Sequence, residues 1–350
     1  MAFNILYIED NDPATIKANL EETDIQVITH DPGDFEASIR KVTTNHIDLL
    51  LLDFTLSSKT AIYEAPTIAQ TIRTKNSENH RDLPIILISS EQNITKYYKD
   101  YTSQDLFDFS ISKEEFLKNP QKYKIRLSSL VNVYRQISNT VRESKSLLSL
   151  LNTPKDIEDK LNIRVKEFLD SEKCKQSTYI ASDFILNHIV KPSGLLIGKD
   201  ILAARLGISS ESPGWCEVEE ALVRYKYTGL FSDVYERWWS SGIEFWWKSF
   251  SPEHPSLKRL RSSERVSILK QSFNITGVVE AEKTQYSKSD SFWTICAKNY
   301  TPLDPIDGFE KNLNKEPWED KEYFSLIGAS EVDLKELKLI DRQRYLDATR

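Results

Sequence analysis

The feature that most constrains the fold is the run at residues 47–53, IDLLLLD, in which four consecutive leucines lie between two aspartates. The run is too short for an ordinary helix, so it predicts a central parallel strand with both faces covered. Ligands of open α/β sheets lie beyond the carboxyl ends of the strands, which is where Asp53 stands. Taken alone, Asp53 could equally be a turn or helix-capping residue.

Short apolar runs alternate with helical patterns through the first third of the chain. Besides the leucine run, strands are predicted at 3–8, 25–29, 84–90 and 106–111, and helices near 13–20, 35–42 and 66–74. This alternation predicts an α/β fold, a doubly wound five-stranded parallel sheet with right-handed crossovers.

Polar residues stand where four of these strands end: Glu9 with Asp10, Asp53, Ser89 and Lys113. Three crowded acids repel one another and raise their pKa values unless a cation lies among them, and hard oxygen ligands at an open site suit Mg²⁺. This set is what phosphoryl transfer to a carboxylate needs. Asp53 would attack phosphorus, and Ser89 and Lys113 would donate hydrogen bonds to the phosphoryl oxygens.

In the order and spacing of these residues, residues 1–137 resemble the receiver domain of bacterial two-component response regulators. The resemblance implies a flavodoxin-like fold and a phosphoacceptor role for Asp53. It also implies that Asp10, Asp53 and the Thr55 carbonyl bind Mg²⁺, with Glu9 assisting through water. The phosphodonor would be a histidine kinase or a phosphotransfer protein.

The sequence departs from the family pattern around these residues. Glu114 and Ser57 stand where prolines are usual, Ser110 replaces an expected aromatic residue, and the stretch from 57 to 82 is longer than usual. The acceptor residues are therefore kept, but the aromatic partner to which Ser89 is usually coupled is missing.

A long helix is predicted over 120–152, because no Gly or Pro interrupts the chain between Pro120 and Pro154. Its apolar residues recur in steps of three and four, with only Ser144 off the pattern: Leu127, Leu130, Tyr134, Ile137, Val141, Leu148 and Leu151. This seam predicts either a homodimeric coiled coil from Leu127 to Leu151 or packing on the C-terminal domain of the same chain.

Residues 153–350 are predicted to form a mainly α (α+β), Trp-rich output or interaction domain, in which 275–281 and 292–298 pair as the two strands of a hairpin. Five tryptophans fall within 33 residues: Trp215, Trp238, Trp239, Trp246 and Trp247. So much aromatic surface must be buried, either in a core or under an unknown protein partner. This region resembles no family, and it contains neither a phosphate-binding glycine loop nor a nucleophile and base pair, so no enzyme is predicted there.

Binding to DNA is not favoured. The net charge of −7 opposes phosphate binding in general. Residues 199–209 have the pattern of a first helix and turn of a helix-turn-helix, but the helix that would enter the groove carries Glu217, Glu219 and Glu220.

The chain is predicted to be soluble and cytoplasmic. No signal peptide is recognisable and no run of 18 apolar residues occurs. The three cysteines are widely separated, which indicates neither a disulfide framework nor a zinc site.

Two functions remain open at this stage. The first is a response-regulator-like signalling protein that is phosphorylated on Asp53 with Mg²⁺ and relays the signal through the long helix to a protein-binding C-terminal domain. The second is an adaptor or scaffold whose unphosphorylated receiver-like domain serves for docking in a multi-component stress or phage-defence system.

Overall fold

The computed structural model describes residues 2–44, 46–57, 62–79, 82–100, 106–273, 275 and 277–349. The chain divides into two compact units, each of which is described by itself: Met1–Leu150 with Arg164–Ile185, and Leu151–Ile163 with Leu186–Arg350. The first unit therefore extends beyond residue 137 and includes a segment, Arg164–Ile185, that the sequence placed in the C-terminal domain.

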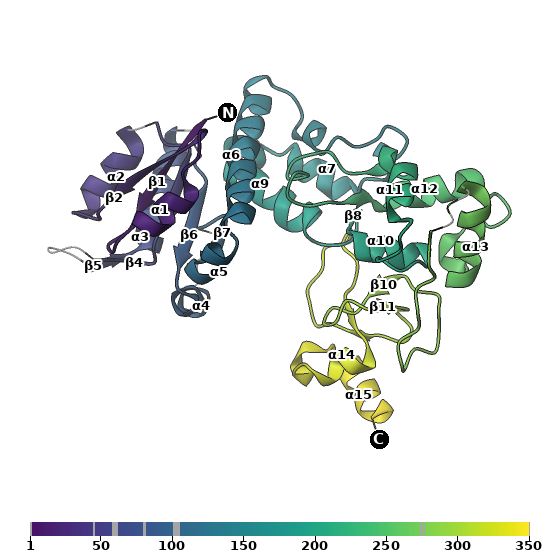
Figure 1. Ribbon diagram of the computed structural model, residues 1–350. Coiled ribbons are helices and arrows are strands. Elements are labelled where there is room, and N and C mark those ends of the chain that lie inside the picture. The colour runs from purple at the N-terminus through teal and green to yellow at the C-terminus, as the bar shows by residue number, and fades with distance from the viewer. Residues whose placement is uncertain are drawn as a thin grey trace. The chain divides into compact units, whose positions relative to one another are not determined.

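The first unit, coloured mainly purple and blue in Figure 1, is built on a parallel sheet with the strand order β2-β1-β3-β6-β7. Its strands are β1 (Phe3–Ile8), β2 (Ile25–His30), β3 (Leu49–Leu52), β6 (Ile85–Ser89) and β7 (Phe109–Ser112). The order of the strands in the sheet differs from their order in the chain, because each connection between parallel strands crosses over the sheet. Such crossovers place helices on both faces of the sheet. The predicted doubly wound α/β sheet is confirmed.

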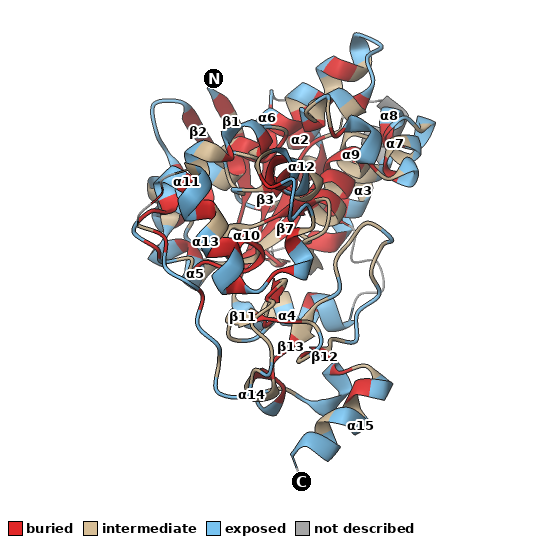
Figure 2. Cartoon of the chain, turned by 90° about the vertical axis from the view of Figure 1, so that its right-hand side faces the viewer, coloured by how far each residue is buried: buried red, intermediate tan, exposed pale blue. Residues whose placement is uncertain are grey.

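Helices separate these strands and cover the sheet: α1 (Ala14–Leu20), α2 (Phe35–Thr44), α3 (Ala65–Asn79), α4 (Glu91–Asp100), α5 (Lys113–Lys118) and α6 (Pro120–Arg142). All four leucines of β3 are 0% exposed, as Figure 2 shows by colour for the strand as a whole. A strand buried on both faces is what the uninterrupted apolar run predicted.

A short hairpin follows Asp53. Its strands β4 (Thr55–Ser57) and β5 (Ile62–Glu64) pair antiparallel and lead into α3. Residues 58–61, which connect the two strands in the sequence, lie outside the described residues. This hairpin accounts for part of the extra length that the sequence shows after residue 57.

The prediction of a single helix over 120–152 is wrong beyond Arg142, where α6 ends. Ser144 has a φ of 54°, the left-handed conformation that terminates helices, and the amide of Lys145 donates to the carbonyl of Thr140. Ser144 is also the residue that breaks the apolar spacing. A 3₁₀ helix, η1 (Leu147–Leu151), carries the last two leucines of the predicted seam.

The apolar seam of α6 is buried within the chain. Leu127, Leu130 and Ile137 are core residues, and α6 packs against α9 (Thr178–Phe184) of the same unit. This corresponds to the intramolecular alternative, in which residues assigned to the C-terminal domain cover the helix. A homodimer through the seam would have to pull these side chains out of a folded unit.

A buried polar network joins α3, α6 and the amino ends of β6 and β7. Asp108, just before β7, accepts hydrogen bonds from Arg73 (2.9 Å), from the Tyr134 hydroxyl (2.6 Å) and from the Ile85 amide (2.8 Å). The guanidinium of Arg73 also lies 3.8 Å from the ring centre of Tyr179 in α9. The network thus fixes α6 and α9 to the sheet at the edge opposite its carboxyl ends.

Segment Arg164–Ile185 is also held by Asp82. One carboxylate oxygen of Asp82 accepts from the Ser177 hydroxyl (2.8 Å) and from the Tyr179 amide (3.0 Å) at the start of α9. A carboxylate at a helix N-terminus compensates the unpaired amides and the positive end of the helix dipole. The segment comprises most of α7 (Ile163–Leu169), then α8 (Glu172–Gln176) and α9.

The second unit is mainly helical. Its helices are the π-helix η3 (Ile185–Val190), α10 (Lys199–Leu206), α11 (Trp215–Ala221), α12 (Ser240–Phe250), α13 (Ser262–Phe273), α14 (Leu326–Ser330) and α15 (Leu339–Ala348). Short 3₁₀ turns are η2 (Glu158–Lys160), η4 (Val223–Tyr225), η5 (Leu257–Arg259) and η6 (Leu334–Glu336).

Two-residue strands complete the second unit, in three antiparallel pairs: β8 (Leu196–Ile197) with β9 (Trp238–Trp239), β10 (Thr294–Ile295) with β11 (Pro302–Leu303), and β12 (Phe309–Glu310) with β13 (Tyr323–Phe324). The predicted pairing of 275–281 with 292–298 is wrong. Ile295 pairs with Pro302, and Glu280 bridges instead to Ile208, next to α10.

All five clustered tryptophans are buried in this unit. Trp215 contacts Trp238 edge to face, and Trp239 contacts Tyr227 in the same manner. The cluster is therefore a core and not an exposed docking face.

No helix among the described residues is long and apolar enough to cross a membrane.

Candidate functional site

The polar residues predicted at the strand ends meet at the carboxyl edge of the first unit's sheet. The strand register aligns these ends, with Ile8 beside Leu52 and Ser89 beside Ser112. The residues that follow, Glu9, Asp53 and Lys113, are therefore brought together although they are far apart in the chain.

Three carboxylates form the centre of this edge. Glu9, Asp10 and Asp53 each offer a carboxylate oxygen, and these oxygens lie within 4.8 Å of one another. Glu9 and Asp53 are buried, and Asp10 is partly exposed. The acids are thus close enough to share one cation and remain reachable from solvent through Asp10.

Asp53 is held by donors on both of its carboxylate oxygens. Its Oδ1 accepts from the Phe54 amide at 2.8 Å, and its Oδ2 lies 3.1 Å from Lys113 Nζ. Burial raises the pKa of Asp53, while hydrogen bonding from Ser89 and the charge of Lys113 oppose that rise only in part. The positive charge near Asp53 is thus too small to cancel the effect of burial on its pKa.

Glu9 has a different environment. Its Oε2 accepts from the Tyr7 hydroxyl and from Lys113 Nζ at 2.6 Å, and its Oε1 accepts from the Asn11 amide at 3.2 Å. Burial acts to raise the pKa of Glu9, but the hydrogen bonds from Lys113 and Tyr7 outweigh it and lower that pKa. Glu9 is therefore ionised and fixed.

Lys113 bridges Glu9 and Asp53. Burial acts to lower the pKa of Lys113, but the hydrogen bond to Glu9 and the charge of Asp53 raise it. The ammonium follows β7 directly, as the first residue of α5, and so reaches back over the sheet edge. It is charged and is placed beside the predicted acceptor.

Ser89 is buried at the end of β6, where Asn93 Nδ2 of α4 donates to its hydroxyl oxygen at 3.1 Å. Ser89 is therefore coupled to α4 through Asn93.

Ser110, which stands where the family pattern expects an aromatic residue, lies on β7 with its hydroxyl 3.4 Å from the Tyr98 hydroxyl of α4.

Thr55 begins β4, two residues beyond Asp53, and pairs with Glu64 of β5. The acid cluster consists of the side-chain carboxylates of Glu9, Asp10 and Asp53. It does not include backbone carbonyls, so the binding of Mg²⁺ by the Thr55 carbonyl stays a prediction.

The donor set of the acid cluster fits Mg²⁺. Carboxylate oxygens are the hard ligands that this ion prefers, and it binds through one or two of them together with water and phosphate oxygens. Lys113 supplies one positive charge against the three carboxylates of Glu9, Asp10 and Asp53. A divalent cation would supply the charge that is missing.

Two site contributors were missed in the sequence: Tyr7 and Asn93. Tyr7 stands on β1 two residues before Glu9, which follows the strand directly, and continued alternation of side chains places both on the same face. Asn93 stands four residues after Ser89, at the start of a helix, where the chain turns back toward the strand end. Both spacings could have been used as signals.

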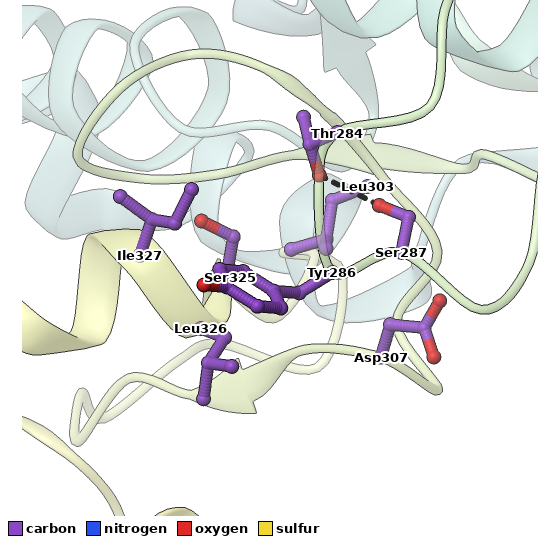
Figure 3. A pocket seen from close by; sticks show the side chains of 8 residues that line it. All are labelled: Thr284, Tyr286, Ser287, Leu303, Asp307, Ser325, Leu326 and Ile327. Carbon is purple, nitrogen blue, oxygen red and sulfur yellow. Dashed lines mark hydrogen bonds between the residues drawn. The ribbon is translucent and has the colours of Figure 1, made fainter. Parts of the chain in front are cut away.

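A second hollow lies in the second unit, between residues 284–287, Asp307 and the start of α14 (Figure 3). Most of its polar groups are already bonded to the protein. Thr284 and Ser287 share a hydrogen bond of 2.7 Å, Asp307 accepts from two backbone amides, and Ser325 caps α14. Its cavity volume of about 20 Å³ is also far smaller than that of most ligand sites. The sheet edge is the stronger candidate.

Comparison with known proteins gave matches among solved structures only. No protein-family model and no curated protein matches the sequence. A CheY-like response regulator receiver domain from Methylobacillus flagellatus is 19% identical over 32% of this chain and 87% of its own, with a TM-score of 0.26. A putative response regulator from Chloroflexus aurantiacus is 15% identical over 35% of this chain and 98% of its own, with a TM-score of 0.28.

A third match is the receiver domain of the Saccharomyces cerevisiae response regulator Ssk1, solved with the histidine phosphotransfer protein Ypd1. It is 16% identical over 35% of this chain and 86% of that chain, with a TM-score of 0.28. These similar chains are response regulators or their receiver domains, and each covers about a third of this chain. The fold itself is established by the strand order and register of the sheet.

Proposed function

We propose that this chain is a response-regulator-like signalling protein that accepts a phosphoryl group on Asp53 from a histidine kinase or a phosphotransfer protein. One observation carries the proposal. A buried carboxylate, an ammonium and a hydroxyl, those of Asp53, Lys113 and Ser89, converge at one sheet edge beside Glu9 and Asp10.

In the proposed transfer, a carboxylate oxygen of Asp53 attacks the phosphorus of a phosphohistidine. The new P–O bond forms as the P–N bond breaks, and the imidazole nitrogen keeps the electron pair. The Phe54 amide orients the attacking carboxylate. Burial removes water from it and so increases its reactivity.

The other residues of the edge stabilise the charge on the phosphoryl oxygens. Lys113, held 3.1 Å from Asp53, and the Ser89 hydroxyl donate hydrogen bonds to these oxygens. Glu9, Asp10 and Asp53, with the Thr55 carbonyl, would hold Mg²⁺, which neutralises negative charge on the phosphoryl group.

The signal is proposed to leave the site through β7. Lys113 follows the carboxyl end of this strand, and Asp108, bound by Tyr134 of α6, precedes its amino end. A shift of β7 would therefore act on α6 and on the α9 segment packed against it. The second unit would read this change by binding another protein.

The alternative is an adaptor whose first unit is not phosphorylated and serves for docking. The observation that favours it is Ser110, which bonds Tyr98 in place of the aromatic switch that the resemblance implies. The two functions differ in whether Asp53 accepts phosphate.

The test is incubation with Mg²⁺ and acetyl phosphate, followed by intact mass measurement. We expect wild type to gain one phosphoryl group and Asp53→Asn to gain none. Asp12→Asn is the matched control, because Asp12 is an exposed acid of the same edge whose cap on the Ala14 amide an asparagine preserves. Wild type that stays unmodified would support the adaptor.

A further inference from the structure

Tyr7 places a buried hydroxyl beside the site, although it belongs to none of the strand-end positions. It is 0% exposed and is the fifth residue of the six-residue strand β1, whose next residue, Ile8, ends the strand. Side chains two residues apart on a strand point to the same face, so Tyr7 and Glu9 meet. The Tyr7 hydroxyl donates to Glu9 Oε2.

The same oxygen of Glu9 also accepts from Lys113 Nζ at 2.6 Å, and that ammonium lies 3.1 Å from Asp53 Oδ2. A continuous line of polar contacts therefore runs from the hydroxyl of Tyr7 through Glu9 and Lys113 to the predicted acceptor. On its other oxygen Glu9 is held by the Asn11 amide.

We propose that Tyr7 is a positioning residue: its hydroxyl fixes Glu9 so that Glu9 holds the ammonium of Lys113 against Asp53. A lysine needs such a support, because its ammonium sits on a flexible four-carbon stem and has no geometric preference of its own. The consequence for phosphoryl transfer rests on the proposed function; the holding of Lys113 does not.

The hydroxyl is the part of Tyr7 that performs this role. A phenylalanine would fill nearly the same volume of the core and would keep the packing of β1. It would leave Glu9 Oε2 with Lys113 but without the second donor that fixes it. Tyr7→Phe therefore separates positioning from packing.

The chain offers a matched control in Tyr134. Its hydroxyl also donates, at 2.6 Å, to a buried carboxylate of the same unit, Asp108, at the opposite edge of the sheet. Tyr134→Phe removes the same kind of hydrogen bond without touching the site, so any effect that both variants share reflects general loss of stability.

The first readout is the reactivity of Lys113 toward acetic anhydride in competitive labelling, scored by mass spectrometry against the other lysines. In Tyr7→Phe we expect Lys113 to react on the order of tenfold faster, because a hydrogen bond to a charged group is lost from its support. In Tyr134→Phe its reactivity should match wild type. Equal reactivity of Lys113 in wild type and Tyr7→Phe would refute the positioning role.

The second readout is the rate of modification by acetyl phosphate with Mg²⁺. Tyr7→Phe should slow it on the order of tenfold. In a Lys113→Ala background the same substitution should have no further effect, because Tyr7 acts through Lys113. An equal slowing in both backgrounds would contradict that route.

The two readouts separate the two ideas. If wild type takes no phosphate, the proposed function fails while labelling still decides the role of Tyr7. If Tyr7→Phe does not fold, Glu9→Gln interrupts the line one contact further on and should raise the reactivity of Lys113 in the same way. Unchanged reactivity in folded Glu9→Gln would overturn the proposal.

Discussion

Asp53 and Asp108 are buried carboxylates at opposite edges of one sheet, 5% and 9% exposed. Burial is the main cause of a raised pKa in both. Asp108 is matched by its own guanidinium, that of Arg73 at 2.9 Å, and bonded by Tyr134 and the Ile85 amide. Its partners form a closed set within the protein.

Within the part of the chain that the structure describes, Asp53 has no cation to itself. It shares the ammonium of Lys113 with Glu9, and Asp10 adds a third carboxylate to the cluster. A buried acid with its own guanidinium holds the fold together, whereas an acid that shares one ammonium with a second carboxylate is short of positive charge. Under the proposed function, a cation and a phosphoryl group would bind at Asp53. Asp53 and Asp108 are alike in burial and in chemical type, so the difference between them lies in the groups that contact each carboxylate.

The largest effect is expected from breaking the closed set. Arg73→Met leaves Asp108 buried without its cation, which should lower the free energy of unfolding by about 3–5 kcal/mol. Urea denaturation measures this loss. Lys17→Met, at an exposed i,i+4 pair, is the control and should change stability by less than about 0.5 kcal/mol. If Arg73→Met lowered the free energy of unfolding as little as Lys17→Met does, Asp108 would not depend on its own cation and would not differ from Asp53 in this respect.

Addition of Mg²⁺ should act on the open edge. At a hundredfold excess over its dissociation constant, the ion should raise the free energy of unfolding of wild type by about 2.7 kcal/mol. Asp53→Asn should lose most of this gain, because the variant lacks one carboxylate of the cluster. Thermal unfolding with and without Mg²⁺ is the measurement, and loss of the gain in Asp12→Asn as well would argue against a specific site.

The pH dependence of stability should distinguish Asp53 from its asparagine variant in metal-free buffer. The folded-state pKa of Asp53 is raised above 3.8, so the folded state binds its proton more tightly than the unfolded state does. The stability that this proton contributes is present below pH 3.8 and is lost as pH rises through the folded pKa.

Wild type should therefore lose stability relative to Asp53→Asn as pH rises above 3.8. Urea unfolding at a series of pH values measures the difference between the two proteins. A difference that does not change with pH would mean that the pKa of Asp53 is the same in the folded and the unfolded state, which would contradict the rise caused by burial.

The smallest effect is expected at the pair of Lys96 and Glu64, which joins α4 to β5. The nitrogen and oxygen are 3.0 Å apart, but the side chains are 50% and 29% exposed. Lys96→Ala should lower the free energy of unfolding by about 0.2–1 kcal/mol, measured by urea denaturation. If Lys96→Ala lost as much stability as Arg73→Met, the exposure of an ion pair would not determine how much it contributes to the free energy of unfolding.

The open edge could be predicted from sequence because it depends on local patterns. An apolar run in the sequence indicates each strand, and the carboxyl ends of parallel strands lie at the same edge of a sheet. Glu9, Asp53 and Lys113 were therefore expected to lie close together at that edge. The helix end at Ser144 also left a local signal, in the break of the apolar spacing.

The closed set could not be predicted in the same way. Arg73, Asp108 and Tyr179 are brought together only by tertiary packing, and nothing in their neighbourhoods marks them as partners. The attachment of Arg164–Ile185 to the first unit depends on such contacts, including that of Asp82 with Ser177. Periodicity indicates that a helix face is apolar, but it does not identify the segment that covers that face.

The most direct test of the account is to locate the phosphoryl group. Wild type incubated with acetyl phosphate and Mg²⁺ is treated with borohydride, which reduces an acyl phosphate to the alcohol, and peptides are then sequenced by mass spectrometry. We expect homoserine at position 53, dependent on Mg²⁺ and about tenfold less abundant in Tyr7→Phe samples taken at early times. Homoserine at Asp108, a reduced side chain at Glu9, or no reduced residue at all would contradict it.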